Sequence, residues 1–302
     1  MKFYKDRIII LLALLTSLLK INRRKNFKIC LCTIVKYENK YISEFIEYYK
    51  KYGVDKIFIY DNNDINGENL NFLSTKKYKI TEIIDYRGIK LAQYKAYSDC
   101  YYKNYQKYNW LIFYDVDEYL FLNNYSNIHD FLSQPKFNKC NSVYLNWLIH
   151  TDNNKILYEN GTLFERFNTV KKDKNFCIGK SIIRGNLTNI HINTCHLLDI
   201  KLKKICDSFG HYIKPKKISC RTPDYKYNYI HHFKYKSLEE FVEKIKMRGD
   251  AVFIDIKNNN KKKIREYLSD NNITLEKINY LSKKLNINSA YIKTLVKKNK
   301  KY

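Results

Sequence analysis

One short apolar run that ends in three acids constrains the fold of this chain more than any other feature. The run Trp110–Tyr114 is rich in aromatic residues and lacks the alternation of a half-exposed strand, which predicts a fully buried strand. Asp115, Asp117 and Glu118 follow it directly. Open α/β sheets bind ligands just beyond the carboxyl ends of their strands. An extended backbone would point Asp115 and Asp117 to the same side, where two hard oxygen donors suit Mg²⁺ or Mn²⁺ carrying a diphosphate.

Alternating strand and helix patterns around this run predict an α/β fold with a doubly wound, mostly parallel sheet. The clearest helix covers residues 40–52, where apolar residues recur with the i, i+3, i+4, i+7 spacing of an amphipathic helix. Gly53 follows as its stop. The expected strands are 28–35, 56–60, 79–84 and 110–114, and a second helix is expected at 91–105.

Residues 140–235 differ from this pattern and are expected to form a separate subregion of short strands joined by polar turns, at 142–146, 163–167 and 181–184. Ser237 and Glu240 then form a capping box, which predicts a helix through Met247. The lysine-rich stretch 257–302 is expected to be a solvated helical tail. The chain is therefore divided into an N-terminal segment of residues 1–26, a main domain of residues 27–250 and a C-terminal extension of residues 251–302.

The chain is strongly basic, with 56 lysines and arginines against 30 acids and a net charge of +26. Such a charge attracts anionic lipids, nucleotide phosphates or nucleic acid. No RNP, zinc-finger or helix-turn-helix pattern supports nucleic acid, which favours a membrane surface or an anionic substrate. The abundance of lysine, asparagine, isoleucine and tyrosine is equally consistent with an AT-rich genome.

The N-terminus and the cysteines bear on location. Ile8–Leu19 is an apolar run of twelve residues with basic flanks, shorter than a standard membrane-spanning helix. A short membrane anchor, an interfacial helix and a helix packed on the domain all remain open for it. The eight cysteines include no C-x-x-C pair and show no disulfide framework, so we expect reduced thiols. These features predict a cytoplasmic, membrane-associated protein.

Several blocks, taken in order, resemble glycosyltransferase family 92 and the related family-2-like bacterial transferases that build surface polysaccharides. The longer blocks are Cys32–Glu38, Ile42–Tyr49, Gly53–Asn63 and Trp110–Glu118. The shorter ones are Asp152–Asn154, Glu165–Phe167, Lys180–Gly185, His196, His232–Ser237 and Arg248–Gly249. The resemblance covers residues 28–250 and departs from the family at Tyr37, where asparagine is usual, and at Cys195, where bacterial relatives often have proline.

The resemblance implies a GT-A fold and an enzyme that moves a sugar from a nucleoside diphosphate donor to a glycan or lipid-linked acceptor. The expected donor is a UDP-sugar, galactose or a relative, and the expected ion is Mn²⁺ or Mg²⁺. Breaking the anomeric bond places negative charge on the departing diphosphate, which an ion held by Asp115 and Asp117 would offset as a Lewis acid. His232, or alternatively His196, is expected to add an imidazole ligand, which Mn²⁺ accepts better than Mg²⁺. A purely structural histidine is the alternative.

The remaining site residues are expected around this ion. Lys36, Glu38, Asp61 and Asn62 follow the first two predicted strands, where they would bind uracil and ribose. An Asx-rich turn is the alternative for the last two. Gln93 is expected in the same pocket. The cations expected to contact the diphosphate are Lys180, Arg184, Lys234, Lys236 and Arg248.

An inverting transfer, which the family suggests, needs a carboxylate to take the proton of the acceptor hydroxyl. Asp152 in a polar turn and Glu165 on a predicted strand both lie in the region expected to bind the acceptor. For Glu165 the alternative is a structural ion pair with Arg166. The competing function is a non-catalytic protein that keeps the fold and binds polyanions or membranes. A nucleotidyltransferase or phosphatase is a third alternative, for which the chain lacks a P-loop or nucleophile motif.

Overall fold

The computed structural model describes residues 27–171, 178–190, 192, 196, 204–214, 225–248 and 256–299, with only the backbone at 248, 256–259, 298 and 299. The predicted N-terminal segment, with its apolar run Ile8–Leu19, lies outside these residues. No helix in the described part of the chain is long and apolar enough to cross a membrane.

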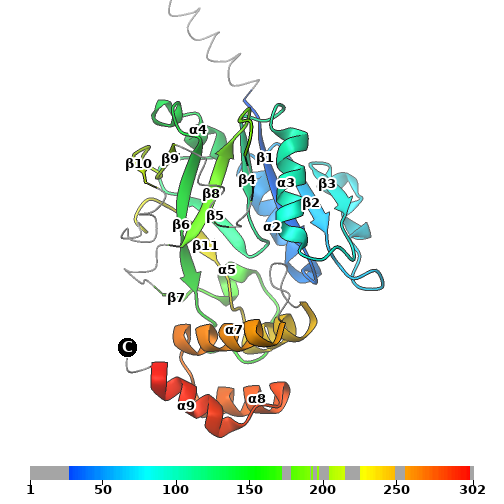
Figure 1. The fold of residues 1–302 in the computed structure, drawn as a ribbon, viewed down its shortest axis with the longest axis vertical. Helices are drawn as coiled ribbons and strands as arrows, with labels where there is room; N and C mark the ends of the chain where they lie inside the picture. Colours follow the sequence, from blue (N-terminus) through cyan, green and yellow to red (C-terminus); the bar gives the residue numbers. More distant parts are fainter. Residues whose placement is uncertain are drawn as a thin grey trace, which may run out of the picture.

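One large mixed sheet and the helices packed on it make up the described residues (Figure 1). The strands are β1 (Ile29–Val35), β2 (Lys56–Asp61), β3 (Thr81–Asp85), β4 (Trp110–Phe113), β5 (Glu118–Leu122), β6 (Ser142–His150), β7 (Val170–Lys171), β8 (Gly179–Arg184), β9 (Ile205–Cys206), β10 (Tyr212–Ile213) and β11 (Asn228–His232). The helices are α2 (Asn39–Lys51), α3 (Ala92–Asn104), α4 (Ile128–Leu132), α5 (Leu163–Arg166), α6 (Leu238–Glu243), α7 (Ile256–Asp270), α8 (Leu275–Leu285) and α9 (Ser289–Asn299). A π-helical segment, Lys244–Arg248, continues α6.

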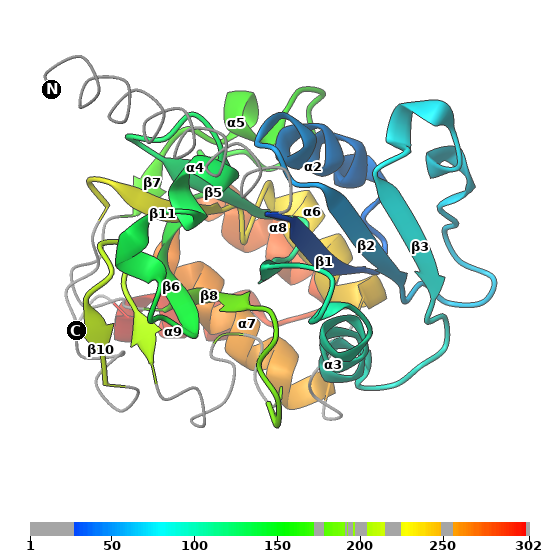
Figure 2. The ribbon, with the colours of Figure 1, turned by 90° about the horizontal axis from the view of Figure 1, so that it is seen from above.

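The sheet has the order β10-β9-β6-β8-β4-β1-β2-β3, with β11 paired to β5 and β6. Its first half is doubly wound, as predicted, because β4, β1, β2 and β3 are parallel and helices cover both faces. Alternate residues of β1 point to opposite faces: Leu31 packs in the core beneath α2, and Cys32 packs in the core beneath α3. Figure 2 shows α2 and α3 on opposite sides of these strands. The carboxyl ends of β1, β2 and β4 therefore meet at one edge of the sheet.

Helix α2 illustrates why the local predictions for this half are confirmed. Its buried residues form one face, Tyr41, Ile42, Phe45, Ile46 and Tyr49. Gly53 follows with φ of +87°, a left-handed conformation that glycine adopts without a steric penalty, so the helix ends where the sequence predicted. The predicted strands of this half lie within two residues of β1, β2, β3 and β4.

The strand predicted at 163–167 is wrong, because these residues begin the helix α5. The Thr162 side chain accepts a hydrogen bond from the Glu165 backbone N–H, and Glu165 Oε2 accepts one from the Thr162 N–H at 2.8 Å. This capping box satisfies two backbone donors and closes a helical turn. The Thr-x-x-Glu spacing that signals it was visible in the sequence.

The expectation of reduced thiols is also wrong, because Cys140 and Cys206 form a disulfide. Strand β9 pairs in parallel with the beginning of β6, placing Cys206 opposite Val143 and next to the chain that leads into β6. The two cysteines are 66 residues apart in the sequence, so only the strand pairing brings them together. Other described cysteines, Cys30, Cys32 and Cys100, are buried free thiols.

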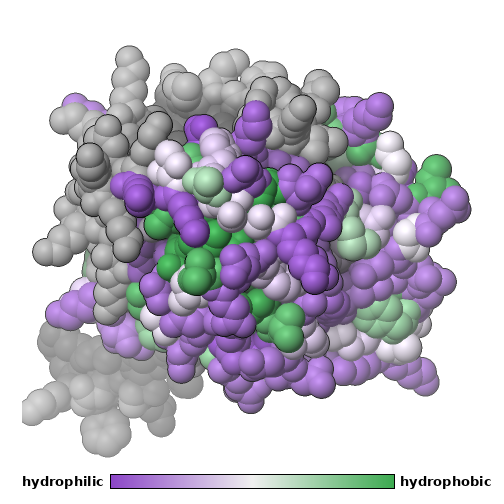
Figure 3. Space-filling view, turned by 90° about the horizontal axis from the view of Figure 1, so that it is seen from below, coloured by the Kyte–Doolittle hydropathy of each residue, from purple (hydrophilic) through white to green (hydrophobic). Residues whose placement is uncertain are grey.

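The C-terminal helices are packed against the core and do not form the expected solvated tail. Tyr267 of α7 and Leu281 of α8 are fully buried in the same core as α2. Lys277 of α8 is also fully buried, and its ammonium lies 2.6 Å from Asp152 Oδ2. The face seen from below, where these helices lie in Figure 1, is mostly hydrophilic (Figure 3). Their lysine-rich composition therefore belongs to outer surfaces, while the inner faces complete the core.

Candidate active site

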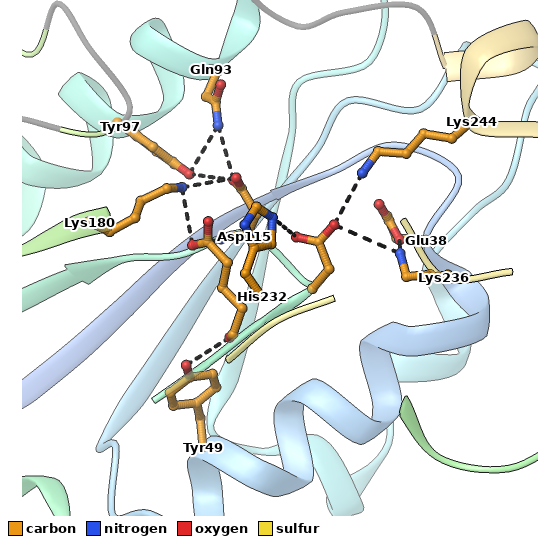
Figure 4. A network of polar contacts seen from close by, with 11 residues as sticks. Glu38, Tyr49, Gln93, Tyr97, Asp115, Lys180, His232, Lys236 and Lys244 are labelled. Carbon is orange, nitrogen blue, oxygen red and sulfur yellow. Dashed lines mark hydrogen bonds and ion pairs between the residues drawn. The ribbon is translucent and has the colours of Figure 1, made fainter. Parts of the chain in front are cut away.

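Asp115 and Asp117 lie in a tight turn between β4 and β5, and Glu118 is the first residue of β5. The Glu118 N–H donates to the Asp115 carbonyl oxygen at 3.0 Å, which closes the turn. Strand β5 then pairs antiparallel with β11 so that Glu118 faces His232. The expected extended backbone is therefore wrong. The turn directs Asp115 and Asp117 toward different partners (Figure 4).

Asp115 contacts donors from α3 and β8. Its Oδ1 accepts from Gln93 Nε2 at 3.0 Å and from the Tyr97 hydroxyl at 2.9 Å. The Lys180 ammonium lies 2.9 Å from Asp115 Oδ2 and 3.2 Å from Glu118 Oε2. The Lys180 side chain is 1% exposed, so this lysine acts as an internal counter-ion for two acids. Its predicted contact with a diphosphate stays a prediction.

Asp117 contacts a second group of cations. The Lys244 ammonium lies 3.1 Å from Asp117 Oδ2, and the Lys236 ammonium lies 3.9 Å from the same oxygen. His232 Nε2 lies 3.6 Å from Asp117 Oδ1. Lys236 also lies 3.6 Å from Glu38, which connects the acid turn to the loop that follows β1. Figure 4 shows these side chains converging from the end of β11 and the chain after it, the π-helical segment after α6 and the loop after β1.

Asp117, Glu118 and His232 fit a divalent cation. Each offers a ligand atom within 4.8 Å of the others, and all three residues are buried. Glu118 Oε1 and His232 Nδ1 are buried without a hydrogen-bond partner, an arrangement that a bound cation would relieve. Burial lowers the pKa of His232 to about 3, which keeps the imidazole in the neutral form that binds metals. Within the described residues, Glu118 joins this group in place of the predicted Asp115.

Lys36, Asp61 and Asn62 lie at the carboxyl ends of β1 and β2, as predicted. Asp61 Oδ1 accepts from the Asn63 N–H at 3.0 Å, and Asn62 Nδ2 donates to the Tyr86 carbonyl at 2.8 Å. The Lys36 ammonium lies 2.7 Å from Asp64. These contacts form the Asx-rich turn that was the alternative, and they bind the loops after β1 and β2 together. A role in nucleotide binding stays a prediction for these residues.

A cavity of about 250 Å³ opens between the start of α2 and α6, and two lysines that contact Asp117, Lys236 and Lys244, line it. Its walls combine aromatic rings with paired charges: Tyr37, Glu38, Tyr41, Tyr235, Lys236 and Lys244. The wall is braced by Glu240, which accepts hydrogen bonds from the Tyr41 hydroxyl and from Arg166. Rings that offer flat faces and ions that offer hydrogen bonds suit a ligand that carries both hydroxyls and phosphate.

The structure contradicts the basis on which Asp152 was expected to act as a base. Its side chain is 1% exposed and pairs with Lys277 at 2.6 Å. It also accepts hydrogen bonds from the Tyr267 hydroxyl and from the Asn154 N–H. A carboxylate enclosed in this way anchors α7 and α8 to the end of β6 and has no open path to an acceptor hydroxyl.

Glu165 is likewise occupied as a helix cap. Its carboxylate accepts from the Thr162 N–H and hydroxyl, and the backbone hydrogen bond lowers the pKa of the carboxyl. The alternative of an ion pair with Arg166 is wrong, because Arg166 pairs with Glu240, 74 residues away in the sequence. A carboxylate with a lowered pKa is a weaker base, so the capping role explains this residue better.

Arg184 was expected to bind the diphosphate, but it lies away from the acid turn. β8 is antiparallel to β4, so Arg184 pairs with Trp110, at the end of β4 away from the acids. The guanidinium lies 4.2 Å from the centre of the Trp110 ring, and its Nε donates to the Cys140 carbonyl at 2.7 Å. Four residues along a strand separate it from Lys180 by roughly 13 Å. The register of β8 against β4 decides which of the two cations, Lys180 or Arg184, lies at the acid turn. The sequence alone does not give this register.

The sequence did not predict the roles of two site residues, Glu118 and Lys244. Glu118 was quoted as part of the acidic motif but was not assigned to the metal. Its place opposite His232 depends on the β5–β11 pairing. Lys244 lies 127 residues after Asp117 and was treated only as part of a predicted helix. Its position two helical turns after the Ser237 cap was the one available signal that it faces the same side as that cap.

Comparison with known proteins places this site in a family. The sequence model of glycosyltransferase family 92 matches residues 25–287. A family 92 protein of Oryza sativa subsp. japonica is 30% identical over 112 residues, which cover 36% of this chain and 19% of the rice protein. A family 92 protein of Arabidopsis thaliana is 32% identical over 96 residues, covering 31% of this chain and 16% of that protein. The chain thus matches less than a fifth of the length of these relatives.

Solved structures overlap with this fold more loosely. S. aureus TarS 1–349 in complex with UDP-GlcNAc is 12% identical, covers 90% of this chain and 89% of TarS, and has a TM-score of 0.38. At that score the overlap carries no argument about the site. The family model, in contrast, spans the acid turn, the cavity and α8. The chain belongs to glycosyltransferase family 92.

Proposed function

We propose that this chain is a metal-dependent glycosyltransferase. It would transfer a sugar from a nucleoside diphosphate donor, UDP-galactose or a related UDP-sugar, to a glycan or lipid-linked acceptor with inversion at the anomeric carbon. The observation that carries the proposal is the buried group Asp117, Glu118 and His232. Two of its neighbours, Lys236 and Lys244, line a cavity whose walls also contain tyrosines and glutamates. Membership of family 92 supports the reaction class.

The proposed transfer has a simple balance of bonds. The acceptor hydroxyl oxygen bonds to the anomeric carbon while the bond from that carbon to the diphosphate breaks. The proton of the hydroxyl would pass to a base on the acceptor side, and the electron pair of the broken bond leaves with the diphosphate. Lys236, which lies between Glu38 and Asp117, would hydrogen-bond that departing charge.

Asp117, Glu118 and His232 are the residues that would hold the cation. When bound, a divalent ion supplies Lewis-acid stabilisation of the diphosphate charge. Lys180 keeps its ammonium between Asp115 and Glu118, which orients the Glu118 carboxylate toward the group. Gln93 and Tyr97 orient Asp115 from α3 in the same way. These contacts from Lys180, Gln93 and Tyr97 hold the acid turn in place before any ligand binds.

Release of UDP from a panel of UDP-sugars tests the proposal. Purified protein with Mn²⁺ should release UDP from one donor, and faster when acceptor is present. Asp117→Asn should lower the rate by at least about 100-fold, because it removes a ligand and a negative charge from the cation site. Glu47→Gln, at a half-exposed acid of α2 that pairs with Lys50, is the matched control and should keep wild-type activity. Full activity of D117N, or of wild type in excess chelator, would refute the metal role.

The same panel of UDP-sugars distinguishes the proposed enzyme from the competing function, a non-catalytic protein that binds polyanions or membranes. If the purified chain binds anionic vesicles or polyanions but releases UDP from no donor, with Mn²⁺ or with Mg²⁺, it is the non-catalytic alternative. Membrane association is a separate part of the proposal, motivated by the basic and apolar sequence of residues 1–26. Fractionation of cells that express the chain with and without residues 1–25 tests it. Equal membrane recovery of both forms would contradict a role for this segment.

A further inference from the structure

Lys244 differs from the other lysines of the acid turn in its exposure. Its side chain is 29% exposed, against 5% for Lys236 and 1% for Lys180. It lines the cavity between α2 and α6, and its ammonium lies 3.1 Å from Asp117 Oδ2. Among the described lysines that contact this turn, Lys244 therefore has the most room to change partner.

Lys244 lies at the junction between the short helix α6, whose start is held by a capping box, and a π-helical segment. α6 begins at the capping box formed by Ser237 and Glu240, and Glu240 is held further by Arg166. Lys244 is the first residue of the π-helical segment that follows. Such segments are rare and often occur at functional sites. A long side chain leaving a braced helix can reach either the acid turn or the cavity without movement of the helix.

Lys244 and a cation at Asp117 would compete for the same carboxylate. With no ligand bound, the ammonium offsets the buried charge of Asp117, whose side chain is 4% exposed. A cation held by Asp117, Glu118 and His232 would take over that role. The ammonium would then need a new anionic partner, and a diphosphate in the adjoining cavity supplies one.

We propose that Lys244 is an exchangeable counter-ion that neutralises Asp117 in the absence of donor and transfers to the diphosphate when the cation and nucleotide bind. This inference rests on the proposed function. Lys236, by contrast, would stay in place, because it is buried between Glu38 and Asp117 with its ammonium 4.0 Å from the centre of the Tyr41 ring. Lys244 is thus a binding residue for the donor whose free-state role is to occupy the cation site.

If Lys244 changes partner in this way, Lys244→Met should change the affinities for Mn²⁺ and for UDP in opposite directions. Mn²⁺ alone should bind more tightly than to wild type, by roughly threefold or more, because no ammonium competes for Asp117. UDP should bind more weakly to the Mn²⁺-saturated variant, by roughly tenfold or more, because a charge-assisted hydrogen bond to the diphosphate is lost. A lysine with a purely structural role would weaken both binding reactions together.

Titration calorimetry with Mn²⁺ alone, and then with UDP at saturating Mn²⁺, measures both effects. Lys246→Met is the matched control, since Lys246 is exposed in the same π-helical segment, and it should leave both affinities unchanged. Lys244→Arg, which keeps the charge, should restore most of the UDP affinity. Unfolding in urea checks that K244M is folded.

The outcomes separate this inference from the proposed function. Failure of wild type to bind UDP with Mn²⁺ would overturn the proposed function and the inference with it. Wild-type binding together with unchanged affinities in K244M would overturn the inference alone. Weaker binding of Mn²⁺ to K244M would also overturn it, because it would show that Lys244 supports the cation site.

Discussion

At the scale of single residues, Lys180 is the side chain on which the acid turn most depends. Its ammonium is buried and lies within 3.2 Å of carboxylate oxygens of both Asp115 and Glu118. Removing one partner of a buried ion pair leaves charge without compensation and costs about 3 to 5 kcal/mol. We expect Lys180→Met to lower the free energy of unfolding by about 3 kcal/mol, near the bottom of that range, because Asp115 is 24% exposed and partly solvated. Urea denaturation measures this loss.

Lys36→Met is the control for K180M at the same scale. Lys36 also pairs with an aspartate at 2.7 Å, but the Asp64 side chain is 54% exposed. An ion pair in water contributes less than about 1 kcal/mol, so K36M should remain close to wild type in stability. Similar losses in the two variants would mean that burial does not set the strength of the Lys180 contacts.

At the scale of elements, a histidine pair joins β6 and β11 on the face of β11 opposite to His232. His150 Nε2 lies 2.8 Å from His231 Nδ1, and His150 Nδ1 lies 2.6 Å from the Phe167 carbonyl oxygen. Burial lowers the pKa of His150 to about 4 and that of His231 to about 3. The unfolded chain, with ordinary histidine pKa values near about 6.5, therefore binds more protons than the folded chain as pH falls. Stability should be complete above pH of about 6.5 and fall below it.

His231→Gln tests this pH dependence. Each histidine with a lowered pKa adds about 1 kcal/mol per pH unit to the decrease in unfolding free energy between pH 6 and pH 5. H231Q should reduce the slope by that amount in urea denaturation series across this range. His211→Gln, at a side chain that is 77% exposed, should keep the wild-type slope. An unchanged slope in H231Q would show that the pair takes up protons in the folded state.

The same elements show how far sequence reasoning reaches. β1, β2 and α2 are predicted well because a buried run or an amphipathic period is a local property. The metal group needs the register of β5 against β11, and the misplacement of Arg184 comes from the direction of β8. Neither register nor direction leaves a local pattern. Arg166 and Glu240 are similar, since only the packing of α5 against α6 pairs them.

At the scale of the whole molecule, elements far apart in the sequence brace the site edge. Asp152, at the end of β6, is tied to α7 through Tyr267 and to α8 through Lys277. Tyr235, just after β11, contacts α7 through Asp270. The C-terminal helices thus hold the end of β6 and the chain after β11, which carries Lys236. This explains why the family match extends into α8 and beyond the predicted domain end at residue 250.

The disulfide makes the last prediction, because it closes a chain segment of 66 residues within the second half of the sheet. Cross-linking a loop of that length restricts the unfolded chain and stabilises the fold by about 4 kcal/mol in the chain-entropy treatment. Replacing Cys140 and Cys206 together by serine should therefore lower the unfolding free energy by up to that amount in urea. Peptide mapping without reductant should recover the two cysteines in one linked species. Dithiothreitol should destabilise wild type and leave the double variant unchanged. Equal stability of oxidised and reduced wild type would contradict the bond, since no other described part of the chain changes on reduction.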